Sequence, residues 1–364
     1  MAIPDEPIRG SYAYLEHPGL LSLSGLEQFR VFMKRRVPFA PLFHLCGGVF
    51  SEAALGTATF TMPATPWWQS SAGVFFGGTY AFVADAALGG AIYTSFPKAT
   101  VLLTSELSMS YLRPATIKSG TINARARVIQ AGEAQGLSEA VVEDAQGRLL
   151  AHATSRCIIM RLPFDPPPPP EELPEFEEPE YPTPDPYLRE ADGALLPREE
   201  FDTKSGLQLA QEWCDGKQPN APIAELMGWR CVEVEEGREV VAMPASEWFC
   251  GAGRNFYGGT LALLADGVMG AAVSTTLPPA SSYASLDLKI YYLRPVQPDG
   301  RDLIARGEVI HRGRTVAVAN VEITDADGKR VATATSSHLV FEGRSWIREG
   351  VSATLDEAPA EEQD

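Results

Sequence analysis

The chain has 364 residues, an apolar content of 45% and a formal net charge of −17 at pH 7. This length allows two or three domains, and the lack of any basic run argues against a nucleic-acid partner. The sequence has no apolar run long enough for a membrane-spanning helix, and residues 1–10 lack the apolar core of a secretory signal. We therefore expect a cytoplasmic protein with no membrane partner.

Much of the acidic charge lies in two segments. Residues 165–185 contain eight acids and no base, and residues 356–364 contain five acids and no base. Removing these 13 carboxylates from the net charge of −17 leaves −4, so the remaining body is only mildly acidic. Five consecutive prolines, Pro166–Pro170, favour an extended conformation. They indicate an acidic, proline-rich linker that acts as a spacer.

Outside these segments one pattern occurs twice, at a constant offset that places Gly258 where the first copy has Gly77. A helix-like stretch that begins near Ser24 has a counterpart that begins near Ser205, and a strand and a helix rich in small residues follow in each copy. Nearly half of the positions from 75 to 97 are identical to their counterparts from 256 to 278, which indicates an internal duplication. The identical residues of the first copy are Phe75, Gly77, Gly78, Thr79, Ala81, Ala84, Asp85, Gly89, Ala91, Thr94 and Pro97.

Several antiparallel strands are predicted after the small-residue helix in each copy. The strand-like runs 102–112 and 283–293 both end in Tyr-Leu-Arg-Pro. Each copy then closes with a hairpin whose glycine, Gly147 or Gly328, suits a positive φ angle. The repeat divides the chain into a flexible N-terminal lead (1–23), a first domain (24–163), a linker (164–198), a second domain (199–343) and an acidic C-terminal tail (344–364).

The five cysteines have no paired spacing, and no cysteine or histidine recurs at the matching position of the other copy. We therefore expect neither a disulfide framework nor a metal site. The unmatched histidines also argue against a duplicated site built on histidine.

Both copies resemble the PaaI-type acyl-CoA thioesterases of the hotdog fold. The resemblance rests on the Gly-Gly that opens the central helix, the Ala-Asp and Gly-x-Ala further along it, and the strand that ends in Tyr-Leu-Arg-Pro. It implies an α+β protein with two tandem hotdog domains, each an antiparallel sheet wrapped around a central helix. It also implies an acyl-CoA thioesterase without a cofactor beyond the CoA of its substrate, and a homo-oligomer such as a dimer of double hotdogs.

The resemblance further implies that each active site lies where the two units meet. The first helical turn of one unit would supply backbone N–H groups, the helix of the other unit a carboxylate, and the strand after that helix a hydroxyl. One site would combine Gly258 and Gly259 with Asp85 and Thr104, and the other would combine Gly77 and Gly78 with Asp266 and Ser285.

These residue types suit thioester hydrolysis, which needs a polarised carbonyl and an activated nucleophile. Unpaired N–H groups at a helix N-terminus stabilise an oxyanion, and glycine lets the backbone approach the thioester closely. An aspartate on a nearby apolar wall can act as a general base or as the nucleophile. Each group also has a structural alternative: tight packing for the glycines, a buried acid at a positive helix end for the aspartates, and a plain strand position for the hydroxyls. Arg113 and Arg294 can likewise hold a CoA phosphate or simply end a strand.

The chain departs from the family where many members carry His before Gly-Gly and Asn six residues earlier. The His position holds Phe76 in one copy and Tyr257 in the other, and the Asn position holds Ser70 and Gly251. Because Tyr257 has a hydroxyl that can donate to the thioester and Phe76 has none, we expect the site of Tyr257 and Asp85 to be the more active.

Two alternatives remain open. The loss of His and Asn is compatible with a non-catalytic hotdog protein that binds acyl-CoA. Asp287, seven residues before Arg294, resembles the acid of the TesB-type double hotdogs. In that case activity would depend on Asp287 and not on the helix aspartates.

Overall fold

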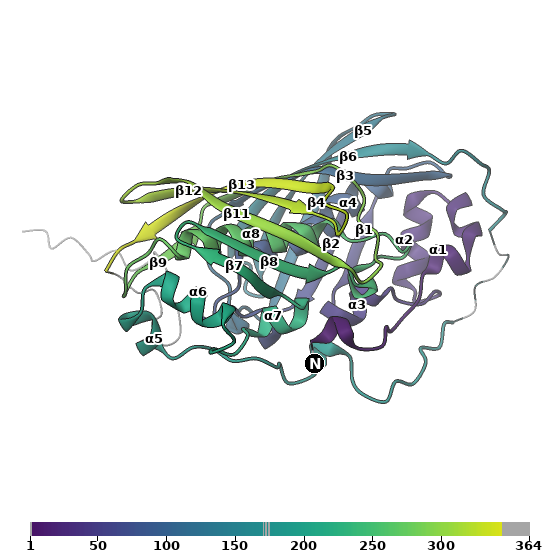
Figure 1. Ribbon diagram of the computed structural model, residues 1–364. Coiled ribbons are helices and arrows are strands. Elements are labelled where there is room, and N and C mark those ends of the chain that lie inside the picture. The colour runs from purple at the N-terminus through teal and green to yellow at the C-terminus, as the bar shows by residue number, and fades with distance from the viewer. Residues whose placement is uncertain (1, 170, 172, 174, 344–364) are drawn as a thin grey trace, which may run out of the picture.

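One continuous antiparallel sheet runs through both halves of the molecule (Figure 1). The computed structural model describes residues 2–343 except 170, 172 and 174. The strands follow the order β1-β2-β4-β5-β6-β3-β10-β13-β12-β11-β8-β7, with β9 paired to β13. Their bounds are β1 Val49–Ala54, β2 Thr57–Pro63, β3 Thr100–Tyr111, β4 Thr121–Ala131, β5 Gln135–Asp144, β6 Leu149–Arg161, β7 Arg230–Glu235, β8 Arg238–Pro244, β9 Ser282–Ser285, β10 Asp287–Tyr292, β11 Asp302–Arg312, β12 Val316–Thr324 and β13 Arg330–Phe341.

Two long central helices, α4 and α8, lie beneath this sheet, and shorter helices surround them (Figure 1). The α-helices are α1 Ala13–Glu16, α2 Gly25–Met33, α3 Pro41–Cys46, α4 Gly77–Thr94, α5 Arg198–Thr203, α6 Gly206–Cys214, α7 Pro222–Met227 and α8 Gly258–Ser274. The 3-10 helices are η1 Ile3–Asp5, η2 Pro18–Ser22, η3 Pro66–Trp68, η4 Ile117–Ser119, η5 Pro186–Leu188 and η6 Glu247–Phe249.

The two halves join through β3 and β10, which are neighbours at the centre of the sheet. Their antiparallel register sets Ser108 opposite Lys289. These two residues occupy equivalent positions of the two copies, so a pseudo-two-fold axis passes between them. The predicted α+β fold of two tandem hotdog units is confirmed.

The central helices are buried on every side because their sequences carry almost no polar residues. They pack against each other in opposite directions, so the N-terminus of each reaches the middle of the other. A Cβ added to Gly78 would lie 2.6 Å from Leu263 Cα, and one added to Gly259 would lie 2.9 Å from Phe82 Cα. The paired glycines therefore allow the two helices to approach closely.

The N-terminal lead is packed, contrary to the prediction that residues 1–23 form a flexible segment. Ile3 is 1% exposed and belongs to the main hydrophobic core, and Ala13 and Leu20 are fully buried. Sequence periodicity does not show this packing, because isolated apolar residues in short helices carry no regular pattern. The lead is nevertheless an integral part of the fold.

The lead also has an equivalent at the end of the linker, so the repeat begins earlier in each copy than predicted. Ser11 N–H donates to Phe39 O, and Ala194 N–H donates to Asn220 O, which is the acceptor at the equivalent position of the second copy. We call residues 2–15 the N-terminal strap and residues 176–196 the linker strap. The N-terminal strap packs on α7 of the second unit, and the linker strap packs on α3 of the first. The two units are therefore held together by exchanged segments.

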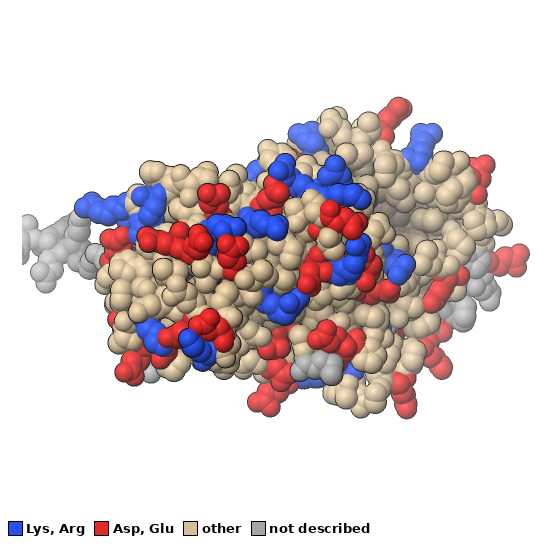
Figure 2. Space-filling view, viewed as in Figure 1, with Lys and Arg blue, Asp and Glu red and all other residues tan. Residues whose placement is uncertain are grey.

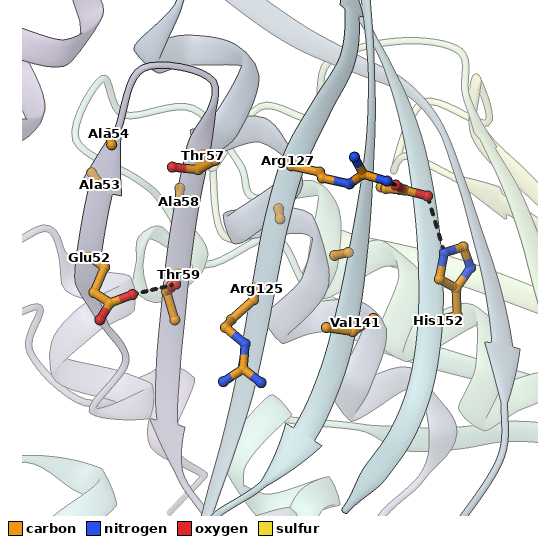
Figure 3. Close-up of a pocket in the computed structure, with 13 residues that line it drawn as sticks. Glu52, Ala53, Ala54, Thr57, Ala58, Thr59, Arg125, Arg127, Val141 and His152 are labelled. Atoms are coloured by element: carbon orange, nitrogen blue, oxygen red, sulfur yellow. Dashed lines mark hydrogen bonds and ion pairs between the residues drawn. The ribbon is translucent and has the colours of Figure 1, made fainter. Parts of the chain in front are cut away.

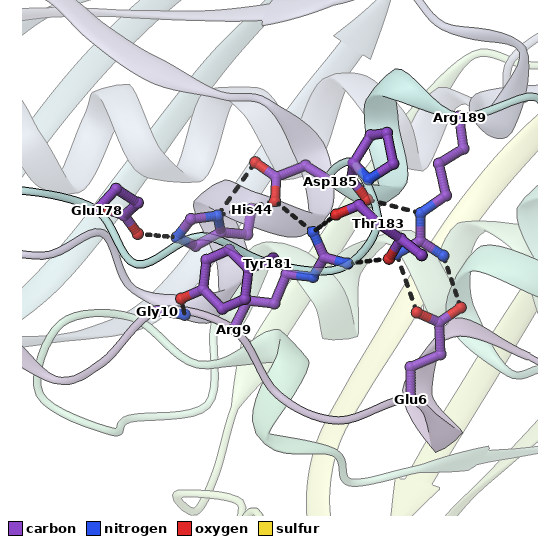
Figure 4. Close-up of polar contacts among 10 residues, drawn as sticks. Glu6, Arg9, Gly10, His44, Glu178, Tyr181, Thr183, Asp185 and Arg189 are labelled. Carbon is purple, nitrogen blue, oxygen red and sulfur yellow. Dashed lines mark hydrogen bonds and ion pairs between the residues drawn. The ribbon is translucent and has the colours of Figure 1, made fainter.

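A polar cluster fastens the linker strap to the first unit (Figure 4). Arg9, only 6% exposed, donates to Thr183 O at 2.6 Å and to Asp185 Oδ1 at 3.2 Å. His44 lies 3.1 Å from Asp185 and 2.8 Å from Glu178. The linker strap is therefore docked onto the first unit, so this part of the linker is more than a spacer. The two straps are also joined directly, because Arg189 donates to both carboxylate oxygens of Glu6 at 2.7 and 2.9 Å.

Other expectations have mixed outcomes. Gly147 and Gly328 have φ angles of +74° and +78°, as the hairpin patterns predict. The expectation that no cysteines pair is wrong, since α6 brings Cys214 to Cys231 of β7 and a disulfide joins them. The predicted acidic tail, 344–364, lies outside the described residues. Among the residues that the structure describes, no helix is long and apolar enough to cross a membrane.

Candidate active site

The N-terminus of α4 meets the middle of α8 at a buried carboxylate. Gly78 N–H donates to Asp266 Oδ2 at 2.8 Å, and the N–H of Gly77 also faces this carboxylate. Asp266 is 1% exposed, and its burial raises its pKa to about 6, although the Gly78 N–H and the Ser285 hydroxyl act to lower it. Asp266 Oδ1 has no hydrogen-bond partner among the described residues. We call this place the Asp266 junction.

The pseudo-symmetric place, the Asp85 junction, lies at the N-terminus of α8. Thr104 Oγ1 donates to Asp85 Oδ1 at 3.1 Å, and the N–H of Gly259 faces the carboxylate. Asp85 is also buried, and burial raises its pKa to about 6. A Cβ on Gly258 would lie 3.0 Å from Asp85 Oδ2, so glycine gives the carboxylate access to the first helical turn. The predicted site residues therefore meet in the two predicted combinations.

The first-turn N–H groups of α4 and α8 face carboxylates and not an open site, contrary to our expectation. We expected the first-turn N–H groups to face a thioester oxyanion. Instead, the Gly78 N–H binds a carboxylate from the other unit, because the positive end of a helix stabilises a negative charge. The glycine pair thus fixes the orientation of the acid, and a bound carbonyl oxygen needs a further donor.

Tyr257 does not supply that donor, contrary to our expectation. Its single hydroxyl proton is donated to the Phe82 carbonyl oxygen of α4, and the two rings pack edge to face with centroids 5.0 Å apart. Phe76, at the equivalent position, packs on Trp229 with a centroid distance of 6.0 Å. Both aromatic residues therefore hold the two units together.

A tyrosine ends both β3 and β10, and the sequence patterns did not identify it as a site residue. Tyr111 of β3 lies against Gly77, since a Cβ on Gly77 would be 2.8 Å from Tyr111 Cζ. Tyr292 of β10 lies against Gly258 in the same way, at 3.4 Å from such a Cβ. The signal in the sequence that marks these tyrosines is the duplicated Tyr-Leu-Arg-Pro.

The arginines themselves have structural contacts. Arg113 Nη1 donates to Leu149 O at 3.0 Å, and Arg294 Nη1 donates to Arg330 O at 2.8 Å. Each guanidinium therefore ties a strand end to the neighbouring hairpin.

Asp287, the acid of the TesB-type alternative, is engaged by the adjacent strand. Ser337 N–H donates to Asp287 Oδ1 at 3.0 Å, and the Ser337 hydroxyl donates to Oδ2. Asp287 is close enough to raise the pKa of Asp266 further. Both of its carboxylate oxygens already accept a hydrogen bond, whereas Asp266 Oδ1 accepts none from the described residues.

An open groove of about 710 Å³ lies elsewhere, over the face formed by β1, β2 and β4–β6 (Figure 3). Its cations are paired with acids: Arg127 contacts Glu139, and His152 lies 3.6 Å from the same carboxylate. Figure 2 shows the same mixture on a wider scale, with basic and acidic residues interspersed over one face of the molecule. The groove is therefore poorly suited to hold a phosphate group.

Two segments of the chain, residues 72–151 and 253–332, match the family model of the Thioesterase superfamily. A candidate esterase of Saccharolobus solfataricus is 31% identical over 119 residues, which span 33% of this chain and 83% of that protein. The chain belongs to the thioesterase superfamily. A candidate esterase of Halobacterium salinarum is 30% identical over 152 residues, or 39% of this chain and 96% of the relative. The expected class, a hydrolase acting on thioester bonds, is thereby confirmed.

Solved structures similar to this thioesterase superfamily member include a tesB protein and a PaaI protein. The tesB protein of Mycobacterium avium subspecies paratuberculosis has 13% identity and a TM-score of 0.49, with 83% of this chain and 98% of that chain covered. The E. coli PaaI protein of the phenylacetic acid degradation operon has 24% identity and a TM-score of 0.34, with 38% and 99% covered.

Proposed function

We propose that this protein is an acyl-CoA thioesterase that hydrolyses its substrate where the two hotdog units meet. The observation that carries the proposal is the state of Asp266. One of its oxygens is held by the N-terminus of α4, while the other is buried without a partner among the described residues. A carboxylate fixed in this way is oriented to act on a bound molecule, and a general base must be positioned before its pKa matters.

The carboxylate is suited to remove a proton from water. With a pKa of about 6 it is largely ionised at neutral pH, yet it is more basic than an exposed aspartate. The Ser285 hydroxyl lies beside the carboxylate and favours its ionised form. Phe76 and Gly77, at the start of α4, are partly exposed, so this end of the junction is open to a ligand.

CoA is proposed as the thiol because of the family. The thioesterase superfamily model covers both junctions, and the Gly-Gly and Asp pattern of the sequence resembles that of the PaaI-type acyl-CoA thioesterases. The protein is further proposed to need no metal or other cofactor, and to form a dimer of double hotdogs.

Turnover of a panel of acyl-CoA substrates tests the function. Thiol release is measured with the wild type and with the double variant Asp85→Asn, Asp266→Asn, which retains the side-chain volume but removes both bases. We expect the double variant to lose at least about 100-fold in kcat, since general base catalysis contributes about 10²–10⁴. Wild-type binding of acyl-CoA without turnover above that of the double variant would establish a non-catalytic binder instead.

The TesB-type alternative is separated by Asp287→Asn. If this single change abolishes turnover while the double variant retains it, the reaction depends on Asp287. Thermal unfolding of each variant is recorded in parallel, because Asp287 links β10 to β13 through Ser337.

A further inference from the structure

The Asp266 junction contains a buried hydroxyl without a partner among the described residues. Tyr111 directs its ring at the first turn of α4, where a Cβ on Gly77 would lie 2.8 Å from Cζ, the carbon that carries the hydroxyl. That hydroxyl oxygen is itself buried. The ring is held in place by Tyr80, which packs against it with centroids 6.0 Å apart and donates its own hydroxyl to Arg113 O.

The Asp85 junction differs at the same position. Tyr292, the equivalent of Tyr111, donates its hydroxyl to Gly258 O at 3.1 Å. Two neighbouring hydroxyl donors there are also committed, because Thr104 binds Asp85 and Tyr257 binds Phe82 O. The two junctions have similar backbones but different hydrogen-bond states.

Unpaired buried polar groups cost free energy, and most native polar groups avoid that state. At the Asp266 junction, a donor on Tyr111 and an acceptor on Asp266 are in that state among the described residues. Burial raises the pKa of Tyr111, and Asp266 is close enough for its charge to raise it further. A donor and an acceptor left free in one site, next to a partly exposed helix start, match the needs of a carbonyl oxygen and a nucleophilic water.

Resting on the proposed function, we propose that Tyr111 is a further catalytic residue, whose hydroxyl donates to the thioester carbonyl oxygen at the Asp266 junction, and that this junction performs the hydrolysis. The first-turn N–H groups do not serve this purpose in the free protein, because they face the Asp266 carboxylate. The Tyr111 hydroxyl is a free side-chain donor whose ring lies directly against this helix start. This assignment reverses the preference for the Tyr257 site.

The chemical step balances with water as the second reactant. Asp266 Oδ1 accepts a proton from water as the water oxygen bonds to the carbonyl carbon. The carbonyl electron pair moves onto the oxygen, where the Tyr111 hydroxyl stabilises the negative charge. The electron pair then re-forms the carbonyl, the carbon–sulfur bond breaks, and Asp266 returns its proton to the leaving sulfur. The products are a carboxylic acid and the free thiol.

Tyr111→Phe is the decisive variant, and Tyr292→Phe is its matched control. Both remove one hydroxyl from equivalent positions. With the acyl-CoA that the wild type hydrolyses best, Tyr111→Phe should lower kcat by about 10²–10³, the usual loss for one oxyanion donor, while KM changes less than about threefold. Tyr292→Phe should change kcat less than about threefold.

Thermal unfolding separates catalysis from folding. Tyr111→Phe removes an unpaired hydroxyl, so its Tm should equal or exceed that of the wild type. Tyr292→Phe removes a formed hydrogen bond, so its Tm should fall. The proposal is overturned if Tyr111→Phe keeps wild-type kcat, if its kcat falls only together with Tm, or if Tyr292→Phe is the variant that loses turnover. A wild type without turnover on any acyl-CoA refutes the proposed function instead.

Discussion

Gly78→Ala tests whether the close approach of α4 and α8 builds the site. The new Cβ would lie 2.6 Å from Leu263 Cα and 3.1 Å from Asp266 Cβ, both shorter than normal contacts. The first of these atoms is backbone, so the helices must move apart. Overpacking of this kind costs about 1–3 kcal/mol. Weakening the hydrogen bond from the Gly78 N–H to the Asp266 carboxylate adds a cost of about 1.5–3 kcal/mol.

The expected result is a protein that unfolds more easily and turns over more slowly. We expect the free energy of unfolding to fall by about 2.5–6 kcal/mol. A displacement of about 1 Å at Asp266 should lower kcat about 100-fold. Urea unfolding followed by fluorescence measures the first quantity, and thiol release from acyl-CoA measures the second.

Gly89→Ala is the matched control on the same helix. Its Cβ would meet only Leu102 Cδ1, at an ordinary 3.7 Å. Alanine is the better helix former, so this variant should gain about 0.5–1 kcal/mol. If Gly78→Ala is as stable and as active as Gly89→Ala, the packing of the two helices does not position Asp266, and the reasoning fails.

Two further predictions concern pH and the strap. Burial raises the pKa of both Asp85 and Asp266 from 3.8 to about 6, so kcat/KM should rise as pH increases towards about 6 and then level. The folded state binds more protons than the unfolded state between about pH 4 and 6, so the unfolding free energy should fall as pH rises through this window. This fall is measured relative to the Asp85→Asn, Asp266→Asn variant. Burial raises the pKa of Glu239 to about 8, but Glu239 is present in the wild type and in the variant, so its contribution to the difference cancels. Parallel stability curves of the two proteins between about pH 4 and 6 would contradict the raised pKa of Asp85 and Asp266. Ile3→Ala should lower the unfolding free energy by about 2–5 kcal/mol, because Ile3 is 1% exposed. Ile8→Ala, at a position 38% exposed, should have little effect. Equal stabilities of the two variants would mean that the N-terminal strap is not part of the core.

The sequence alone determined the fold and the pairing of site residues. The duplication at a constant offset predicts two equal units, and Gly-Gly followed by Asp on a small-residue helix predicts, through the family resemblance, that each carboxylate serves the other unit's helix start. These features are readable because they are local patterns repeated at fixed spacing. The contacts from Gly78 to Asp266 and from Thr104 to Asp85 follow that pattern.

The tertiary structure decided which polar groups are free. Tyr111 and Tyr292 have the same sequence context, yet the Tyr292 hydroxyl binds Gly258 O and the Tyr111 hydroxyl binds none of the described residues. The docking of the straps and the pairing of Cys214 with Cys231 are likewise invisible in the sequence. Hydrogen-bond partners of this kind lie far apart along the chain and depend on small differences in packing, to which a pattern of residue types is insensitive.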